Sequence, residues 1–304
     1  MKIQRSLLIL PVNVPRFIDK AHLRGADAIV LDLEDSIPPS EKDSAREHVS
    51  SAIGKVGRAG ADVFVRVNND PALFEKDMHA AVRSGLYAIF LPKVESENFV
   101  RETETLLSQL ESERGVLAGS IKLSLHIESP KALLNLQSIL AAGTRIESIS
   151  LGTDDYCLEL GVEPTPEGTE LFFPLVMLIT AAKAMGIQPM GILGSVAGYR
   201  DPEGFRKAAE RGRQLGCTGA FCIHPDQVDI LNKVFSPDQA QVDQALRIKA
   251  VFEESMAQGR AATTLDERMI DTPIYKRALR TIQLADAAKE RERNAGAATR
   301  NLSE

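Results

Sequence analysis

The chain of 304 residues is poor in cysteine, in basic charge and in long apolar segments. Its three cysteines, Cys157, Cys217 and Cys222, form no C-x-x-C motif, which argues against a disulfide framework and predicts buried thiols in a reducing compartment. The formal net charge of −6 argues against a nucleic-acid-binding protein, which needs a basic face. No apolar run reaches the roughly 18–20 residues that span a bilayer, and the N-terminal run is too short for a signal peptide. These absences favour a cytoplasmic protein without nucleic-acid or membrane partners.

Short, β-branched apolar runs recur along the chain instead. Amphipathic segments of helix length separate them, a pattern typical of parallel strands in βα units. The runs cover residues 6–12, 28–35, 63–68, 88–94, 122–129, 147–155, 187–196 and 219–225. Eight such units predict an α/β fold, the (β/α)8 or TIM barrel, whose active site lies at the C-terminal ends of the strands.

The sequence changes character after residue 225. Helices are expected at 228–235, 238–258 and 266–288. The charged, Gly- and Ala-containing segment 289–304 is expected to be a frayed tail. We therefore expect a barrel over residues 1–235 and a C-terminal helical arm over residues 236–304.

Polar side chains share one face of three predicted strands. Because side chains alternate along a strand, one parity points into the barrel and the other packs against the helices. The polar parity contains Asp32, Glu34, Arg66, Asn68, Ser124, His126 and Glu128. Charged groups inside a barrel are costly unless they are paired or bind an ion, so a polar site is expected there.

Glu128 and Asp155 end consecutive strands and can converge on one hard cation. Mg²⁺ suits one or two carboxylates together with waters and substrate oxygens. The alternative is that Glu128 pairs with Arg66 while Asp155 caps a helix. Asp154 precedes Asp155, so either aspartate is a candidate ligand.

Arg66 and the segment 152–155 are candidate anion-binding groups. Arg66 would either form an interior ion pair with Glu34 or Asp35, or hold a carboxylate or enolate. The segment Gly152-Thr153-Asp154-Asp155 leaves a strand as a turn whose N–H groups could hold a small carboxylate.

Three other polar residues have structural explanations. His126 is expected to be a hydrogen-bonded core histidine, and His224 to position the turn before Pro225. Asp271 interrupts the helical pattern of the arm and is expected to cap the helix that contains Ile274.

These motifs together resemble the citrate lyase β-subunit-like family, the HpcH/HpaI aldolase/citrate lyase group that includes malyl-CoA and citramalyl-CoA lyases. The resemblance extends from Arg5 to about Leu284. Its carriers are RSLL at 5–8, GAD at 25–27, LDLEDS at 31–36, VRVN at 65–68, LPK at 91–93, IESP at 127–130, LGTDD at 151–155, IHPDQ at 223–227 and MIDTP at 269–273.

The resemblance implies a magnesium-dependent carbon–carbon lyase. Glu128 and Asp155 would bind Mg²⁺, and Arg66 would lie on the thioester carbonyl or enolate oxygen. Asp271 would be an acid/base on a lid that the arm delivers to a neighbouring subunit of a homotrimer or hexamer. The implied substrate-binding set also contains Glu34, Asp35, Lys93, Gly152, Thr153 and Asp154.

The reaction implied is reversible Claisen-type cleavage of a 3-hydroxyacyl-CoA. Citramalyl-CoA or malyl-CoA would yield acetyl-CoA and the 2-oxo acid pyruvate or glyoxylate. Two alternatives stay open: a citrate lyase β subunit that acts on a citryl group carried by an acyl-carrier protein, and a non-catalytic barrel that binds 2-oxo acids.

Overall fold

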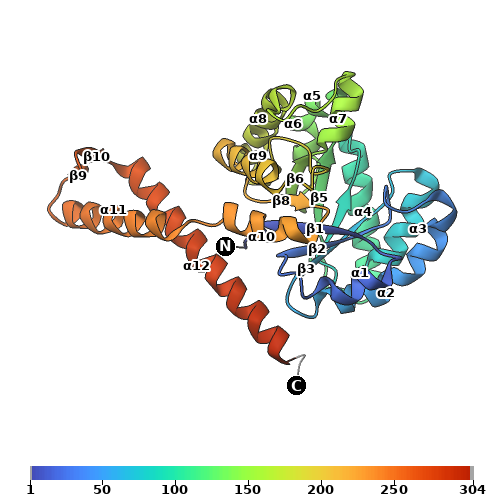
Figure 1. The fold of residues 1–304 in the computed structure, drawn as a ribbon. Coiled ribbons are helices and arrows are strands. Elements are labelled where there is room, and N and C mark those ends of the chain that lie inside the picture. The colour runs from blue at the N-terminus through green and yellow to red at the C-terminus, as the bar shows by residue number, and fades with distance from the viewer. Residues whose placement is uncertain (1, 302–304) are drawn as a thin grey trace.

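A single parallel sheet organises the computed structural model, which describes residues 2–301 (Figure 1). Its strands are β1 (Ser6–Pro11), β2 (Ala28–Asp32), β3 (Asp62–Arg66), β4 (Ala88–Leu91), β5 (Lys122–Ile127), β6 (Ile146–Leu151), β7 (Gln188–Met190) and β8 (Ala220–Cys222). Their order is β7-β6-β5-β4-β3-β2-β1-β8, and a parallel bridge between Met190 and Gly219 links the two edges. The predicted (β/α)8 barrel is confirmed.

Helices cover the outside of the sheet. They are α1 (Pro15–Ala21), a 3₁₀ turn (Pro39–Glu41), α2 (Lys42–Gly57), α3 (Pro71–Ala81), α4 (Glu97–Glu113), α5 (Pro130–Leu134), α6 (Leu136–Ala141), α7 (Thr153–Leu160), α8 (Thr169–Ala184), α9 (Pro202–Leu215) and α10 (Pro225–Val234). Helix α7 begins at Thr153, where the sequence predicts the end of a strand and a turn. Cys157, Cys217 and Cys222 are buried and free, as expected.

The buried apolar side chains form two layers. The larger layer lies between strands and helices, and the smaller one fills the barrel. The barrel filling consists of Leu7, Ala28, Val30, Phe64, Ala88, Phe90, Met190 and Phe221. On the same inward faces, Asp32, Arg66 and Glu128 follow at the C-terminal ends of their strands. The polar site therefore stands on an apolar barrel core.

The C-terminal arm projects away from the barrel (Figure 1). It consists of α11 (Gln239–Ala257), the antiparallel hairpin of β9 (Thr263–Leu265) and β10 (Arg268–Ile270), and α12 (Thr272–Asn301). The helix expected over 266–288 is wrong at its start, because residues 266 and 267 take positive φ angles of 50° and 63° in a two-residue hairpin turn.

Helix α12 returns from the hairpin to the barrel and continues past it. The expectation of a frayed tail over 289–304 is wrong up to Asn301, and residues 302–304 lie outside the described part. The physical reason is that Arg291 and Glu292 form ion pairs with Asp27 and Arg5 of the barrel. Every helix within residues 2–301 is too short or too polar to cross a bilayer.

Candidate active site

Carboxylates surround Arg66, the last residue of β3. Its Nε and Nη2 donate to Oδ1 and Oδ2 of Asp32 at 2.6 and 2.7 Å, and the two residues are register partners on β2 and β3. Nη1 lies 3.1 Å from Glu34 Oε2 and 3.5 Å from Asp35 Oδ2. Burial opposes both charges, but the pair lowers the pKa of Asp32 and raises the pKa of Arg66. The expected ion pairs with Glu34 and Asp35 are present, although Asp32 is the main partner.

Two lysines fix the loop that follows β2. Lys42 Nζ donates to the carbonyl oxygens of Leu33 and Glu34 at 2.8 and 2.7 Å. Lys93 Nζ lies 2.8 Å from Glu34 Oε1 and 3.6 Å from Asp35 Oδ1. Glu34 is therefore held between Arg66 and Lys93, so the loop presents a fixed charge arrangement beside the end of β3.

Glu128 is a buried carboxyl without an adequate partner. Its Oε1 lies 3.4 Å from His126 Nε2, while its buried Oε2 has no hydrogen-bond partner among the described residues. Burial, together with the charges of Asp155 and Glu34, raises the pKa of Glu128 to about 8. Arg66 makes its two shortest hydrogen bonds to Asp32. The alternative, an ion pair between Glu128 and Arg66, is therefore not present.

The two aspartates of α7 differ in their surroundings. Asp154 is exposed and accepts a hydrogen bond from Ser195 Oγ at 2.9 Å. Asp155 is half-buried, faces the same cavity as Glu128, and its charge contributes to the raised pKa of Glu128. Of the two candidate ligands, Asp155 is therefore the one paired in space with Glu128.

Gly152 allows the end of β6 to approach β5 closely. A Cβ at this position would lie 2.5 Å from Glu128 Cγ and 2.8 Å from His126 Nε2, so a side chain here would displace both. Gly152 is also the N-cap of α7, which replaces the expected turn. The N–H groups of a first helical turn have no partner within the helix, so they can hold an anion as the turn was expected to do.

A cavity of about 510 Å³ opens at the C-terminal ends of the strands. The predicted site residues that line it are Asp35, Arg66, Glu128, Gly152, Thr153, Asp154 and Asp155. Glu34 and Lys93 adjoin it through their ion pairs. Asp271 lies between β10 and α12, where its Oδ1 accepts a hydrogen bond from the Ile274 N–H at 3.2 Å, so the predicted helix cap is present.

Sequence reasoning underestimated Asp32 and His126. His126 is hydrogen-bonded as expected, with Nδ1 2.5 Å from Ser150 Oγ, but it lines the cavity beside Glu128. Burial lowers the pKa of His126 to about 3, so the ring is neutral. The inward strand parity was the signal for both residues. His224, which was expected to position the turn before Pro225, is instead the N-cap of α10, and the Asp226 N–H donates to its Nδ1 at 3.3 Å.

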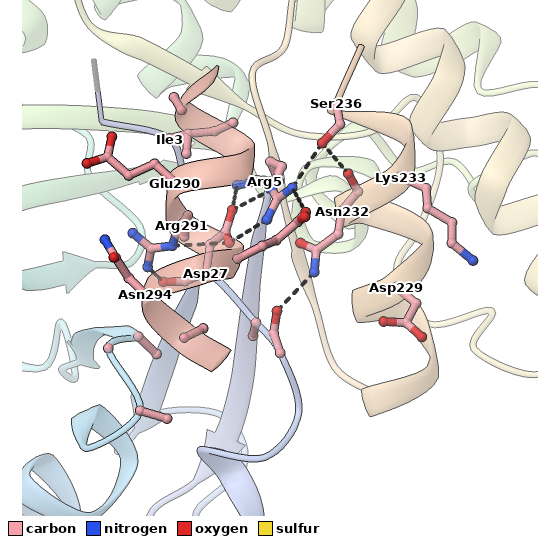
Figure 2. A pocket seen from close by; sticks show the side chains of 18 of the residues that line it. Ile3, Arg5, Asp27, Asp229, Asn232, Lys233, Ser236, Glu290, Arg291 and Asn294 are labelled. Atoms are coloured by element: carbon pink, nitrogen blue, oxygen red, sulfur yellow. Dashed lines mark hydrogen bonds and ion pairs between the residues drawn. The ribbon is translucent and has the colours of Figure 1, made fainter. Parts of the chain in front are cut away.

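A larger cavity of about 810 Å³ lies at the opposite, N-terminal end of the barrel (Figure 2). Its buried charges satisfy one another. Asp27 accepts hydrogen bonds from Nε and Nη2 of Arg5 at 2.9 and 3.0 Å, and lies 3.1 Å from Arg291 Nε. Arg5 Nη1 lies 2.9 Å from Glu292 Oε1. This network attaches α12 to the barrel, which leaves the C-terminal cavity as the candidate active site.

The comparison with protein families accords with this geometry. Residues 5–225 match the family described as HpcH/HpaI aldolase/citrate lyase. The chain belongs to this family. The citrate lyase subunit beta of Haemophilus influenzae is 35% identical over 96% of this chain and 100% of its own length. The chain is therefore a lyase of this family, as the resemblance implied.

A second curated relative carries a different enzyme name, and a solved structure shares the fold. The L-malyl-CoA/beta-methylmalyl-CoA lyase of Rhodobacter capsulatus is 29% identical over 95% of this chain and 96% of its own. The protein CitE from Mycobacterium tuberculosis, solved in complex with magnesium, acetoacetate and coenzyme A, has a TM-score of 0.73 at 22% identity. That alignment covers 94% of this chain and 98% of the other, so the two share the whole fold.

Proposed function

We propose that the protein is a Mg²⁺-dependent lyase that reversibly cleaves a 3-hydroxyacyl-CoA, such as citramalyl-CoA or malyl-CoA. The products would be acetyl-CoA and the 2-oxo acid pyruvate or glyoxylate. The observation that carries the proposal is the buried, unpartnered Oε2 of Glu128 beside Asp155. A buried carboxylate without a counter-charge is strongly unfavourable, and a hard cation removes that penalty.

Glu128 and Asp155 fit Mg²⁺ as a ligand pair. Mg²⁺ is commonly held by one or two carboxylates and keeps positions for water and substrate oxygens. Within residues 2–301, groups of three or more potential metal-ligating side chains are absent, which suits a site completed by substrate. A bound Mg²⁺ would polarise the hydroxyl and carboxylate oxygens of the substrate.

Arg66 would stabilise the enolate. In the cleavage direction the hydroxyl gives its proton to solvent and becomes a carbonyl, the adjacent carbon–carbon bond breaks, and its electron pair remains on the acetyl-CoA enolate. The bidentate bond to Asp32 fixes the Arg66 guanidinium before substrate binds. A donor aimed at a developing oxyanion contributes about 3–4 kcal/mol to the transition state. The first turn of α7, from Thr153 to Asp155, would hold the carboxylate of the oxo acid.

Asp271 would protonate the enolate carbon, or take the proton in the condensing direction. Its own arm points away from its own barrel, so the group would act on a neighbouring subunit of a homotrimer or hexamer. Exposed apolar side chains on the arm, Leu246, Met256 and Met269, support burial of this surface against a second copy. The free thiols and the net charge of −6 support a cytoplasmic location.

The test is cleavage of citramalyl-CoA and malyl-CoA by the purified protein, with and without Mg²⁺, and with the oxo acid trapped as its hydrazone. We expect Mg²⁺-dependent release of pyruvate, glyoxylate or both. A protein that is folded and binds Mg²⁺ but cleaves neither ester would contradict the proposal. In that case citryl-loaded acyl-carrier protein is the next substrate, and oxo-acid binding without turnover would identify a binding barrel.

A further inference from the structure

A smaller cavity of about 340 Å³ lies at the N-terminal end of the barrel, between the starts of the strands and helix α12. Residues just before β1 and β8 and the starts of β6 and β7 line it, together with the end of α8 and with Arg280 and Leu284 of α12. Among the described residues, it shares none of its lining with the cavity that contains Glu128. Its volume falls in the range of small-molecule sites, about 300–1,000 Å³. The cavity is therefore a separate candidate for ligand binding.

This cavity gathers positive charge, although the whole chain has a net charge of −6. Among residues 2–301, Lys2, Lys183 and Arg280 line it, and Glu147 is the one carboxylate in its wall. The first of these cations is already paired, because Lys2 Nζ lies 2.9 Å from Asp62 Oδ1. Lys183 and Arg280 remain as the cations that are available to an anion.

Lys183 and Arg280 act on each other without a counter-charge. Neither side chain has a hydrogen-bond or ion-pair partner in the described part of the chain, and Glu147 accepts a hydrogen bond from Gln188 Nε2 at 3.1 Å instead. Burial and the charge of Arg280 lower the pKa of Lys183. The Cys217 thiol would attract Lys183 if it were ionised, but burial raises the pKa of Cys217 to about 12 and keeps the thiol neutral. Two neighbouring cations repel each other, and an anion bound between them replaces that repulsion with attraction.

A buried acceptor in the same wall indicates that the ligand also donates a hydrogen bond. Gln4 is 1% exposed, and its Nε2 donates to Asp62 Oδ2 at 3.0 Å. Its Oε1 has no hydrogen-bond partner among the described residues. Exchanging the oxygen and nitrogen of the amide would set Oε1 against the Asp62 carboxylate, so the hydrogen bond to Asp62 fixes the orientation. A buried acceptor without a partner is unfavourable, and an O–H group of a ligand would satisfy it.

We propose that this cavity is a second ligand site, which binds a small phosphate-type anion that keeps an O–H group. Lys183 and Arg280 would bind the anionic oxygens, and Gln4 Oε1 would accept the O–H. A carboxylate near neutral pH offers no such donor, whereas hydrogen phosphate and hydroxyl-bearing phosphate esters do. Because Lys183 belongs to α8 and Arg280 to α12, the anion would connect the barrel with the C-terminal arm. The site lies at the opposite end of the barrel from Glu128, so its failure would leave the proposed lyase activity intact.

Calorimetric titration with inorganic phosphate tests the proposal, in Mg²⁺-free buffer near neutral pH and at constant ionic strength. We expect a Kd of about 1 mM or tighter. Sulfate has the same tetrahedral shape but no O–H group, so we expect it to bind at least about 5-fold more weakly. Glycerol 3-phosphate separates the two sources of the group, since tighter binding than inorganic phosphate favours an ester and weaker binding favours the free ion. Absence of phosphate binding, or equal binding of sulfate, overturns the proposal.

A pair of double variants locates the binding. Lys183→Gln/Arg280→Gln removes the two cations, and Lys20→Gln/Arg101→Gln is the matched control because it removes the same charge from exposed side chains outside the cavity. Lys20 also stands in the last turn of its helix, as Lys183 does. We expect phosphate to bind at least about 10-fold more weakly to the first variant and within about 2-fold of the unsubstituted protein to the second. Unchanged affinity in Lys183→Gln/Arg280→Gln would place the phosphate elsewhere and overturn the proposal.

Discussion

Each end of the barrel buries a carboxyl group, but only the one at the N-terminal end is paired with positive charges. At the N-terminal end, Asp27 is 2% exposed and is surrounded by Arg5 and Arg291 (Figure 2). At the C-terminal end, Glu128 is 4% exposed, keeps an unpartnered oxygen and has a pKa raised to about 8. A satisfied buried charge fixes structure, whereas an unsatisfied one marks a place where a ligand completes the protein.

The largest expected effect is on activity, at the end that needs a ligand. Glu128→Gln and Asp155→Asn keep the shape of the site but remove the charges that hold a cation. We expect kcat/KM for the preferred CoA ester to fall by at least about 1,000-fold, together with the loss of Mg²⁺ binding in calorimetry. Near-normal turnover in either variant would refute the metal assignment.

The second effect is on stability and has opposite signs at the two ends. Asp27→Asn leaves Arg5 and Arg291 without their shared counter-charge, so we expect the free energy of unfolding to fall by about 3–5 kcal/mol. Glu128→Gln removes a buried carboxyl group that, without metal, must either stay protonated above its ordinary pKa or carry an unpaired charge, so the metal-free protein is expected to unfold at an equal or higher temperature. Thermal unfolding of the two variants in EDTA tests both expectations. If Glu128→Gln lost as much stability as Asp27→Asn, the contrast between a paired and an unpaired buried carboxyl group would be wrong.

A third effect follows from the pKa of Glu128, which rises from its ordinary value of 4.5 to about 8 in the folded protein. The folded state then binds a proton that the unfolded state releases, so without metal the protein loses stability as pH rises from 4.5 towards 8. Because Mg²⁺ competes with that proton, its stabilising effect should grow by a few degrees in Tm between about pH 6 and pH 8. Melting curves with Mg²⁺ and with EDTA test this, and a gap independent of pH would contradict it.

The smallest effect concerns the shape of the site. Gly152→Ala adds a Cβ that would lie 2.5 Å from Glu128 Cγ, so we expect kcat/KM to fall by about 10–100-fold while Tm changes little. Gly54→Ala is the control, since a Cβ there meets nothing within 4 Å and the residue is inside α2. Equal kcat/KM in the two variants would show that catalysis does not depend on the close approach of β6 to β5.

Local patterns in the sequence were sufficient for the barrel and for most of the site. Apolar runs mark the strands, and strand parity brings Arg66, His126 and Glu128 into one cavity, because these rules depend on residues close in sequence. The ion pair of Arg66 with Asp32 could not be predicted in the same way, because it depends on which residues of β2 and β3 lie side by side, and local sequence patterns do not determine that register.

The errors lie where distant contacts or rare backbone angles decide the structure. Residues 289–301 are helical because Arg291 and Glu292 bind Asp27 and Arg5, which are more than 260 residues away in the chain. The hairpin of β9 and β10 turns through Asp266 and Glu267, which adopt positive φ without the usual glycine or asparagine. Neither feature has a local sequence signal.

Helix α12 connects the ion pairs at the N-terminal end of the barrel with Asp271. Twenty residues separate Asp271 from Arg291, which corresponds to about 30 Å of continuous helix. If Asp271 is the proton donor, the helix would connect it rigidly to the Arg5–Asp27–Arg291 cluster. A rotation of the helix by about 5° at this cluster would move Asp271 by roughly 2.5 Å, nearly the length of a hydrogen bond. The position of Asp271 in the active site of a neighbouring subunit would thus depend on ion pairs at the N-terminal end of its own barrel.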